Sequence, residues 1–449
     1  MRKRVLLLSF AFVAVSAPAF AQTPSPSPSP EPPPAPAPAP AEAYPPPAAE
    51  PVPAPPPPAP PKEEASKEDK QLLRFYAWIK PTVGVASAAV ESFSQPNASA
   101  ISAAGNPALA SVPDEARATF QVAQSRFGVW VNEKQPVRGQ LEFDLVDFTK
   151  ASPTVASVPR IRIAKGEWAP SKEVLVIAGQ DWDIHAPIAP HGYNLVGAAY
   201  LAGNTGFMRQ QVKLLYTLPN LELGAAIGLQ GNNNTNRDAS IELSRMPTFA
   251  ARVAYLAGDV GRVGVSGIVS QLRFGPGTDN DHYVTAGGGA LYFDLTPVKP
   301  FNVRAEGYVG RNLANLSLLA LGQRVGDDDI DEVGGFLSAK LKITDSHAVY
   351  AHGGTAQTLK PSKVAPSYAY PAATGGGTPG PAALSGTGPG LKYNITARVG
   401  YEIRISKFAA VFLEGSYYRS KFALVAADEG RFDSLRQAFV GELGMMFTL

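Results

Sequence analysis

The sequence predicts an all-β protein, a transmembrane antiparallel β-barrel of about 16 strands with a disordered Pro-rich arm at its N-terminus. Three observations predict this class. Long segments alternate apolar and polar side chains, the first residues have the pattern of an export signal, and no later apolar run reaches the roughly twenty residues of a membrane-spanning helix. A closed barrel is the other architecture that satisfies every backbone group in lipid.

The segment Lys392–Ile405 shows the alternation most clearly. Its odd positions are apolar and include Tyr393 and Tyr401, whereas its even positions are polar or glycine and include Arg398 and Glu402. Odd and even side chains of a strand point to opposite faces, so this strand has one apolar face and one ionic face. An arginine in lipid near the bilayer centre costs about 2 to 4 kcal/mol. We therefore expect the ionic face to line a wet interior.

Residues 1–21 are predicted to be a cleaved signal peptide. The basic start Met1–Arg4 is followed by the apolar run Val5–Val15 and by the small-residue site Ala19–Ala21. This order is typical of secretory leaders, and the apolar run is shorter than an anchor helix requires. The protein has no cysteine, and its 40 basic and 38 acidic residues nearly balance. Neither disulfides nor a nucleic-acid partner is therefore expected.

Residues 22–71 are predicted to be a periplasmic linker. As far as residue 61 this stretch is almost wholly Pro, Ala, Ser and Glu, and a short charged piece, 62–71, follows. Such a composition favours an extended polyproline-type tether over ladders or helices. The arm is either a spacer that contacts the cell wall or a featureless tail, and the sequence leaves both readings open.

Residues 72–449 are predicted to form the barrel. Amphipathic segments alternate there with connectors that are in turn long and short, as in barrels with tight periplasmic turns and longer outer loops. The even number of strands places both chain ends on the same side of the membrane. The expected strands are 72–86, 118–133, 137–148, 159–168, 173–181, 207–218, 221–231, 247–257, 261–273, 282–295, 301–312, 333–344, 347–357, 392–405, 409–422 and 434–449.

The last of these strands indicates which membrane holds the barrel. It carries Phe439, Leu443, Phe447 and Leu449 on one parity and ends at the final residue. This arrangement resembles the C-terminal signature that the barrel assembly machinery recognises. We therefore expect the outer membrane of a Gram-negative envelope, with that machinery, lipid and lipopolysaccharide as partners.

The inward parity of the strands supplies the candidate pore residues. A sixteen-stranded barrel is too wide for side chains to fill, so its selectivity depends on what lines the lumen. Basic side chains outnumber acidic ones on the inward walls, which favours carboxylates or phosphates as solutes. The alternative is that these charges pair across strands. The predicted pore-lining residues are Arg126, Arg138, Glu142, Asp144, Arg160, Arg162, Arg209, Lys213, Arg252 and Arg304.

The connector Trp182–Gly206 is the predicted constriction loop. It is the third outer loop, and its apolar content is unsuited to a solvated surface. Long loops without structure of their own are often functional. Asp181, Asp183 and His185 share one parity at its start and are expected to form an acidic, titratable lip that faces the arginine wall.

Five short runs carry a family resemblance. They are Ser125–Gly128, Glu142–Asp144, Arg160–Ala164, Gly166–Trp168 and Gly179–Trp182, and their order and spacing match as well as their residues. Together they resemble the DcaP-like outer-membrane porins over about a seventh of the chain. The resemblance implies a trimeric sixteen-stranded channel for small, often anionic solutes such as dicarboxylates, with the arginines of these runs in the lumen.

No enzymatic, cofactor or metal site is expected. The chain has no Gly-x-Ser-x-Gly motif and only 5 histidines, which argues against an outer-membrane hydrolase. The acidic run Asp327–Glu332 lacks the glycine and terminal glutamate of a calcium loop and is expected to be a solvated outer loop. The sequence thus predicts passive, partly selective diffusion of small hydrophilic solutes, with anions favoured. A non-selective porin and a tether to the cell wall are the alternatives.

Overall fold

The computed structural model describes most of the chain from Leu72 to the C-terminus. The predicted signal peptide, 1–21, and linker, 22–71, lie outside the described residues. The described residues are 72–88, 90, 93, 116–145, 159–194, 199, 201–230, 246–274, 281–324, 327–365, 390–424 and 434–449.

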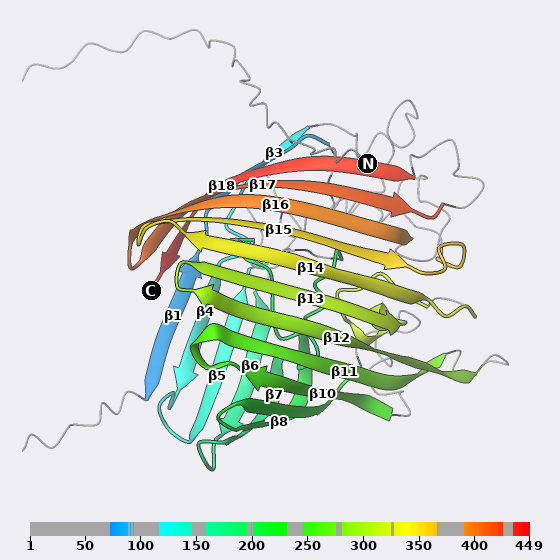
Figure 1. Ribbon diagram of the computed structural model, residues 1–449, viewed down its shortest axis with the longest axis horizontal. Coiled ribbons are helices and arrows are strands. Elements are labelled where there is room, and N and C mark those ends of the chain that lie inside the picture. The colour runs from blue at the N-terminus through cyan, green and yellow to red at the C-terminus, as the bar shows by residue number, and fades with distance from the viewer. Residues whose placement is uncertain are drawn as a thin grey trace, which may run out of the picture. The chain divides into compact units, whose positions relative to one another are not determined.

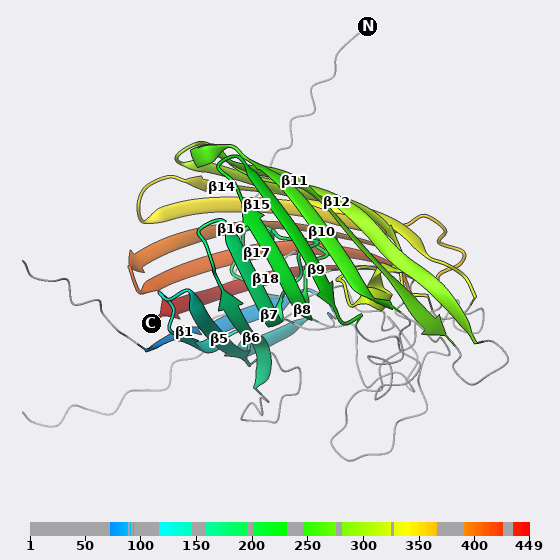
Figure 2. The same ribbon diagram turned by 90° about the horizontal axis from the view of Figure 1, so that it is seen from below.

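The strands form one closed antiparallel barrel (Figures 1 and 2). From β4 to β18 each strand pairs with its neighbour along the chain, and the ring closes through the pairs β18–β1, β18–β2, β1–β4 and β2–β3. The strands are β1 (Leu73–Ile79), β2 (Thr82–Ala86), β3 (Arg117–Gln121), β4 (Arg126–Val131), β5 (Val137–Asp144), β6 (Arg160–Trp168), β7 (Val174–Trp182), β8 (Met208–Thr217), β9 (Leu221–Gly228), β10 (Met246–Leu256), β11 (Gly261–Phe274), β12 (His282–Val298), β13 (Phe301–Arg311), β14 (Asp331–Lys342), β15 (His347–Thr358), β16 (Leu391–Ser406), β17 (Ala409–Phe422) and β18 (Leu435–Thr448).

The first two predicted strands are each divided into two segments, β1 with β2 and β3 with β4. The 18 strand segments therefore form a barrel of 16 strands. β1 and β2 meet at Lys80 and Pro81, and β3 and β4 are separated by the turn 122–125. Proline has no N–H to give to a ladder. Beside it, the Lys80 N–H donates to the Ser125 side-chain oxygen at 3.0 Å instead of to a ladder carbonyl. The sixteen-stranded barrel is confirmed, and the two breaks are additions to the prediction.

The outer face of the barrel is apolar. Exposed side chains such as Val265, Leu337, Val399 and Phe439 lie on one parity of their strands, while the other parity is largely buried. Side chains on opposite parities face opposite sides of a sheet, so these exposed residues point away from the lumen. Among the described residues, no helix has the length and apolar character needed to cross a membrane.

Aromatic rings lie flat against glycines of the neighbouring strand on the inner face. A Cβ at Gly334 would lie 2.6 Å from the Tyr308 hydroxyl oxygen, and one at Gly400 would lie 2.2 Å from the Tyr350 ring. Any larger residue would displace these rings. The rings form part of the buried apolar clusters inside the barrel, on which the loop between β7 and β8 packs.

Candidate functional site

The loop between β7 and β8, described at residues 183–194, 199 and 201–207, lies inside the barrel over those residues and is called here the inward loop. Its first limb is held by β11, where Ser266 Oγ donates to the His185 carbonyl. Its last limb is held by β13, where Thr205 Oγ1 donates to Glu306 Oε1 at 3.0 Å. Ser266 and Glu306 both lie on the inner face of the far wall, so the loop that they hold crosses the lumen. The sequence predicts that this connector constricts the channel, and that role stays a prediction.

The tip of the inward loop rests on a buried ion pair. The Tyr193 N–H donates to Glu414 Oε1 at 2.7 Å, and the Tyr193 ring stacks on Phe412 with 4.4 Å between centroids. Glu414 Oε2 lies 3.1 Å from Arg398 Nη1, and the two side chains are 0% and 1% exposed. The loop tip is therefore fixed by a hydrogen bond to the Glu414 carboxylate, whose charge Arg398 already balances. The aromatic stack on Phe412 adds about 1 kcal/mol beyond the free energy of its buried area.

A second loop also enters the barrel, between β13 and β14. It carries the short 3-10 turn η3 (Leu313–Leu316), and Leu313 and Leu316 are fully buried. The backbone of Leu319 donates to the Thr205 carbonyl at 3.1 Å, so this loop packs on the inward loop. The prediction of a solvated acidic outer loop after it needs correction in part. Asp327 and Asp328 are exposed, but Asp329 pairs with Arg324 at 2.6 Å, Asp331 begins β14 and Glu332 is buried.

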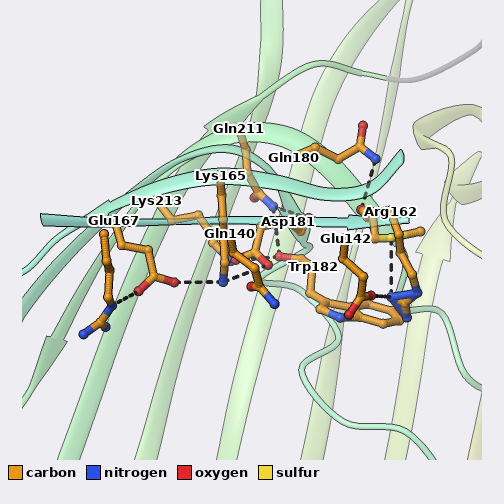
Figure 3. A network of polar contacts seen from close by, with 12 residues as sticks. Gln140, Glu142, Arg162, Lys165, Glu167, Gln180, Asp181, Trp182, Gln211 and Lys213 are labelled. Carbon is orange, nitrogen blue, oxygen red and sulfur yellow. Dashed lines mark hydrogen bonds and ion pairs between the residues drawn. The ribbon is translucent and has the colours of Figure 1, made fainter. Parts of the chain in front are cut away.

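Two predicted arginines on β6 lie beside the predicted carboxylates on β5. Arg160 Nη2 is 2.7 Å from Asp144 Oδ2. Arg162 Nη1 is 3.4 Å from Glu142 Oε1 (Figure 3). Arg160 keeps 34% of its side chain exposed, whereas Asp144 is fully buried. The cation is therefore in front of its partner on the lumen side. Arg162 is only 4% exposed and its guanidinium lies 4.6 Å from the centroid of the Trp182 ring.

The other predicted basic residues also face carboxylates, which is the cross-strand pairing that the sequence left open. Arg126 is buried, with its guanidinium 5.2 Å from the centroid of the Trp78 ring, and lines the lumen cavity. Asp181 and Asp183 both serve as partners instead of forming a free acidic lip. The pairs are Arg138–Glu167 at 2.5 Å, Arg209–Asp183 at 2.6 Å, Lys213–Asp181 at 2.5 Å, Arg252–Glu222 at 2.8 Å and Arg304–Asp294 at 3.2 Å.

Lys165 and Glu167 are wall residues that the sequence analysis missed. Strict alternation from Arg162 would have placed both in lipid. A register shift between β5 and β6 reverses the parity, and Lys165 Nζ then lies 2.8 Å from Glu167 Oε1 and 3.4 Å from Asp181 Oδ1 (Figure 3). Trp168 was the available signal, because an aromatic at a strand end belongs on the outer face.

His185 is buried in the first limb of the inward loop. Its backbone N–H donates to Asp183 Oδ1 at 3.0 Å, and its ring Nδ1 lies 3.3 Å from Ser266 Oγ. Burial lowers the pKa of His185 to about 4, and the nearby Arg209 charge acts in the same direction. The imidazole is therefore neutral at neutral pH. It is a packing and hydrogen-bonding group of the loop instead of a titratable lip.

A cavity of about 410 Å³ lies between the inward loop and the wall from β4 to β11. Its basic lining residues are Arg126, Arg160, Arg162, Lys213, Arg252 and Arg262. Among the described residues that line it, Asp183 is the acidic one. Glu142, Asp144 and Asp181 do not line it, because they lie behind their cationic partners. A solute in this cavity would meet mainly positive charge.

Within the described ranges, no group of His, Asp and Glu is arranged to hold a metal ion. Glu142, Asp183 and Asp181 pair with arginine or lysine instead.

The fold has counterparts among solved structures. The chain is similar to the outer membrane channel DcaP of Acinetobacter baumannii, with a TM-score of 0.60, 14% identity, and coverage of 84% of this chain and 97% of that one. It is also similar to Salmonella typhi OmpF in complex with daunomycin, with a TM-score of 0.51, 10% identity, and coverage of 84% and 97%. No protein-family model and no curated protein sequence matches the chain. The chain has the porin fold of outer-membrane channels, a closed antiparallel barrel of 16 strands.

Proposed function

We propose that this protein is a passive outer-membrane channel that favours small anionic solutes such as carboxylates. One observation carries the proposal. The cavity beside the inward loop is lined by six basic side chains and by Asp183, while Glu142, Asp144 and Asp181 are buried and do not line it. A positively lined constriction in a barrel favours anions, because the solute exchanges water for guanidinium and ammonium donors.

The exposure of Arg160 makes it the strongest candidate for solute contact. Its side chain is 34% exposed in the lumen, and Asp144 holds it from behind with two hydrogen bonds, at 3.0 and 2.7 Å. A guanidinium held in this way keeps further N–H donors for a passing carboxylate. Arg162 is nearly buried, so its role is to hold the wall and to add positive charge at short range.

The test compares two exposed, paired arginines in planar bilayers. Arg160→Gln removes a lumen charge beside the cavity and should lower the chloride-to-potassium permeability ratio obtained from reversal potentials. Arg311→Gln is the matched control, because Arg311 is 50% exposed, pairs with Asp331 and does not line the cavity. An unchanged ratio in Arg160→Gln would contradict the assignment. Equal permeability in the unaltered channel would favour the non-selective porin instead.

The remaining predictions rest on the sequence and the family resemblance. They include export by residues 1–21, a periplasmic arm over 22–71 and assembly as a homotrimer. The same applies to contacts with lipopolysaccharide, the barrel assembly machinery and the cell wall. The proposed channel has no catalytic step. Analytical ultracentrifugation of the detergent-solubilised protein tests the trimer, and N-terminal sequencing of the membrane form tests cleavage before Gln22.

A further inference from the structure

The cavity beside the inward loop has an apolar lining as well as a basic one. Phe207, Met208, Leu215 and Leu319 line it and are only partly buried, and Trp182 lines it with 41% of its surface exposed. These residues come from the two loops inside the barrel and from the ends of β7 and β8. The basic residues come mainly from the barrel wall. The cavity therefore joins a cationic surface to an apolar one.

The two kinds of lining residue lie within one small solute's reach of each other. The Arg162 guanidinium is 4.6 Å from the centroid of the Trp182 ring, and the Arg160 guanidinium is 6.0 Å from that of Phe207. Arg162 Nη1 also lies 3.8 Å from the Met208 sulfur. When a solute carboxylate binds either arginine, the solute carbon bonded to that carboxylate would thus lie against aromatic or thioether surface.

The apolar lining has a physical consequence for which anions bind. Apolar surface in contact with water is unfavourable, and covering it contributes about 25 cal/mol per Å². A small hydrophilic acid leaves this surface wet, whereas an acid with an aryl or alkyl body covers it. Ligand sites generally have volumes of about 300 to 1,000 Å³ and a mostly apolar lining with a few polar groups that fix orientation. The cavity of about 410 Å³ fits that description.

We infer that the cavity is a binding site for amphipathic anions, in which the carboxylate of an aryl or medium-chain alkyl acid pairs with Arg160 and its apolar body lies against Phe207 and Leu319. The inference rests on the proposed function and narrows its solute class.

Block of single-channel current in the full-length protein tests the inference. The probes are 3-phenylpropionate, which has charge and an apolar body, acetate, which has charge alone, and 3-phenylpropanol, which has the body alone. 3-Phenylpropionate should interrupt the current at roughly tenfold lower concentration than acetate, since burying part of one ring is worth about 1.4 kcal/mol. 3-Phenylpropanol should not block at the concentration at which 3-phenylpropionate does.

A pair of leucine variants separates the cavity from general packing. Leu319→Ser removes apolar lining and should bring the half-blocking concentration of 3-phenylpropionate up by roughly tenfold, toward that of acetate. Leu424→Ser is the matched control, because Leu424 is a partly buried leucine that packs on the apolar cluster inside the barrel without lining the cavity. It should leave the blocking concentrations unchanged.

The outcomes distinguish this inference from the proposed function. Equal block by 3-phenylpropionate and acetate, in a channel that still prefers chloride, would overturn the inference and leave the proposed function in place. Equal block by 3-phenylpropanol and 3-phenylpropionate would overturn it as well, because charge would then play no part. If the unaltered channel showed no preference for chloride, both the inference and the proposed function would be overturned.

Discussion

Replacing Glu414 by alanine should destabilise the barrel and release the inward loop. In the structure one carboxylate serves three groups. Glu414 Oε2 pairs with Arg398 at 3.1 Å, while Oε1 accepts from the Tyr193 N–H at 2.7 Å and from the Tyr350 hydroxyl at 2.8 Å. Glu414→Ala leaves the guanidinium of Arg398, which is 1% exposed, without its carboxylate.

The size of the effect follows from burial. Removing one partner of a buried ion pair costs about 3 to 5 kcal/mol, because the remaining charge is stranded in a poorly solvated place. Glu414→Gln keeps an acceptor for Tyr193 and Tyr350 and should cost about half as much. An exposed pair behaves differently. Asp345 is fully exposed and pairs with Lys342 at 3.0 Å, so Asp345→Ala is the control and should have no measurable effect.

Two measurements check this prediction. Thermal or urea unfolding of the detergent-solubilised barrel should show Glu414→Ala well below the unaltered protein, with Glu414→Gln between them. Open-channel conductance should rise or flicker in Glu414→Ala, because the tip of the inward loop has lost its anchor. An unfolding midpoint for Glu414→Ala equal to that of Asp345→Ala would refute the reasoning.

Two further predictions concern the inward loop. Gly203→Ala should make the loop sensitive to protease, because Gly203 has a φ of +112° and a Cβ there would lie 2.1 Å from the Gly335 carbonyl oxygen. Gly258→Ala is its control, with a φ of +56° and open space around the position, and should leave proteolysis of the loop unchanged. Loop docking should weaken as the pH falls from about 6.5 to about 4, because burial lowers the pKa of both His185 and His191 to about 4. The released loop takes up protons in that window and the docked loop does not, whereas above it both forms are neutral and docking is fully retained. Conductance noise recorded across that pH range measures the change. The same pH dependence of the noise in a variant with both histidines replaced by glutamine would contradict the prediction.

Much of the barrel could be predicted because period-two alternation is a local property of the chain. The segment Lys392–Ile405 gave β16 (Leu391–Ser406) almost to the residue. The break at Pro81 also has a local cause, since proline has no N–H to give to a ladder, whereas the parity reversal before Lys165 depends on pairing with a neighbouring strand. A register shift of one residue moves every later side chain to the other face, and alternation alone does not reveal it.

The candidate site was less accessible to sequence reasoning. The positions of Arg160 and Arg162 on the inner face followed from their spacing. Their relative exposure, 34% against 4%, depends on Asp144, Trp182 and the two loops, and these meet only in the folded barrel. The loop between β13 and β14 did carry a local signal in Leu313, Leu316, Leu318, Leu319 and Leu321, since five leucines in an outer loop are poorly suited to water.

The reversal potential of the unaltered channel across a tenfold potassium chloride gradient tests the central claim most directly. The cationic lining of the cavity predicts a potential displaced toward the chloride equilibrium value. A potential displaced toward the potassium value would show that the recessed carboxylates, and not Arg160 and its basic neighbours, dominate the field that a solute meets.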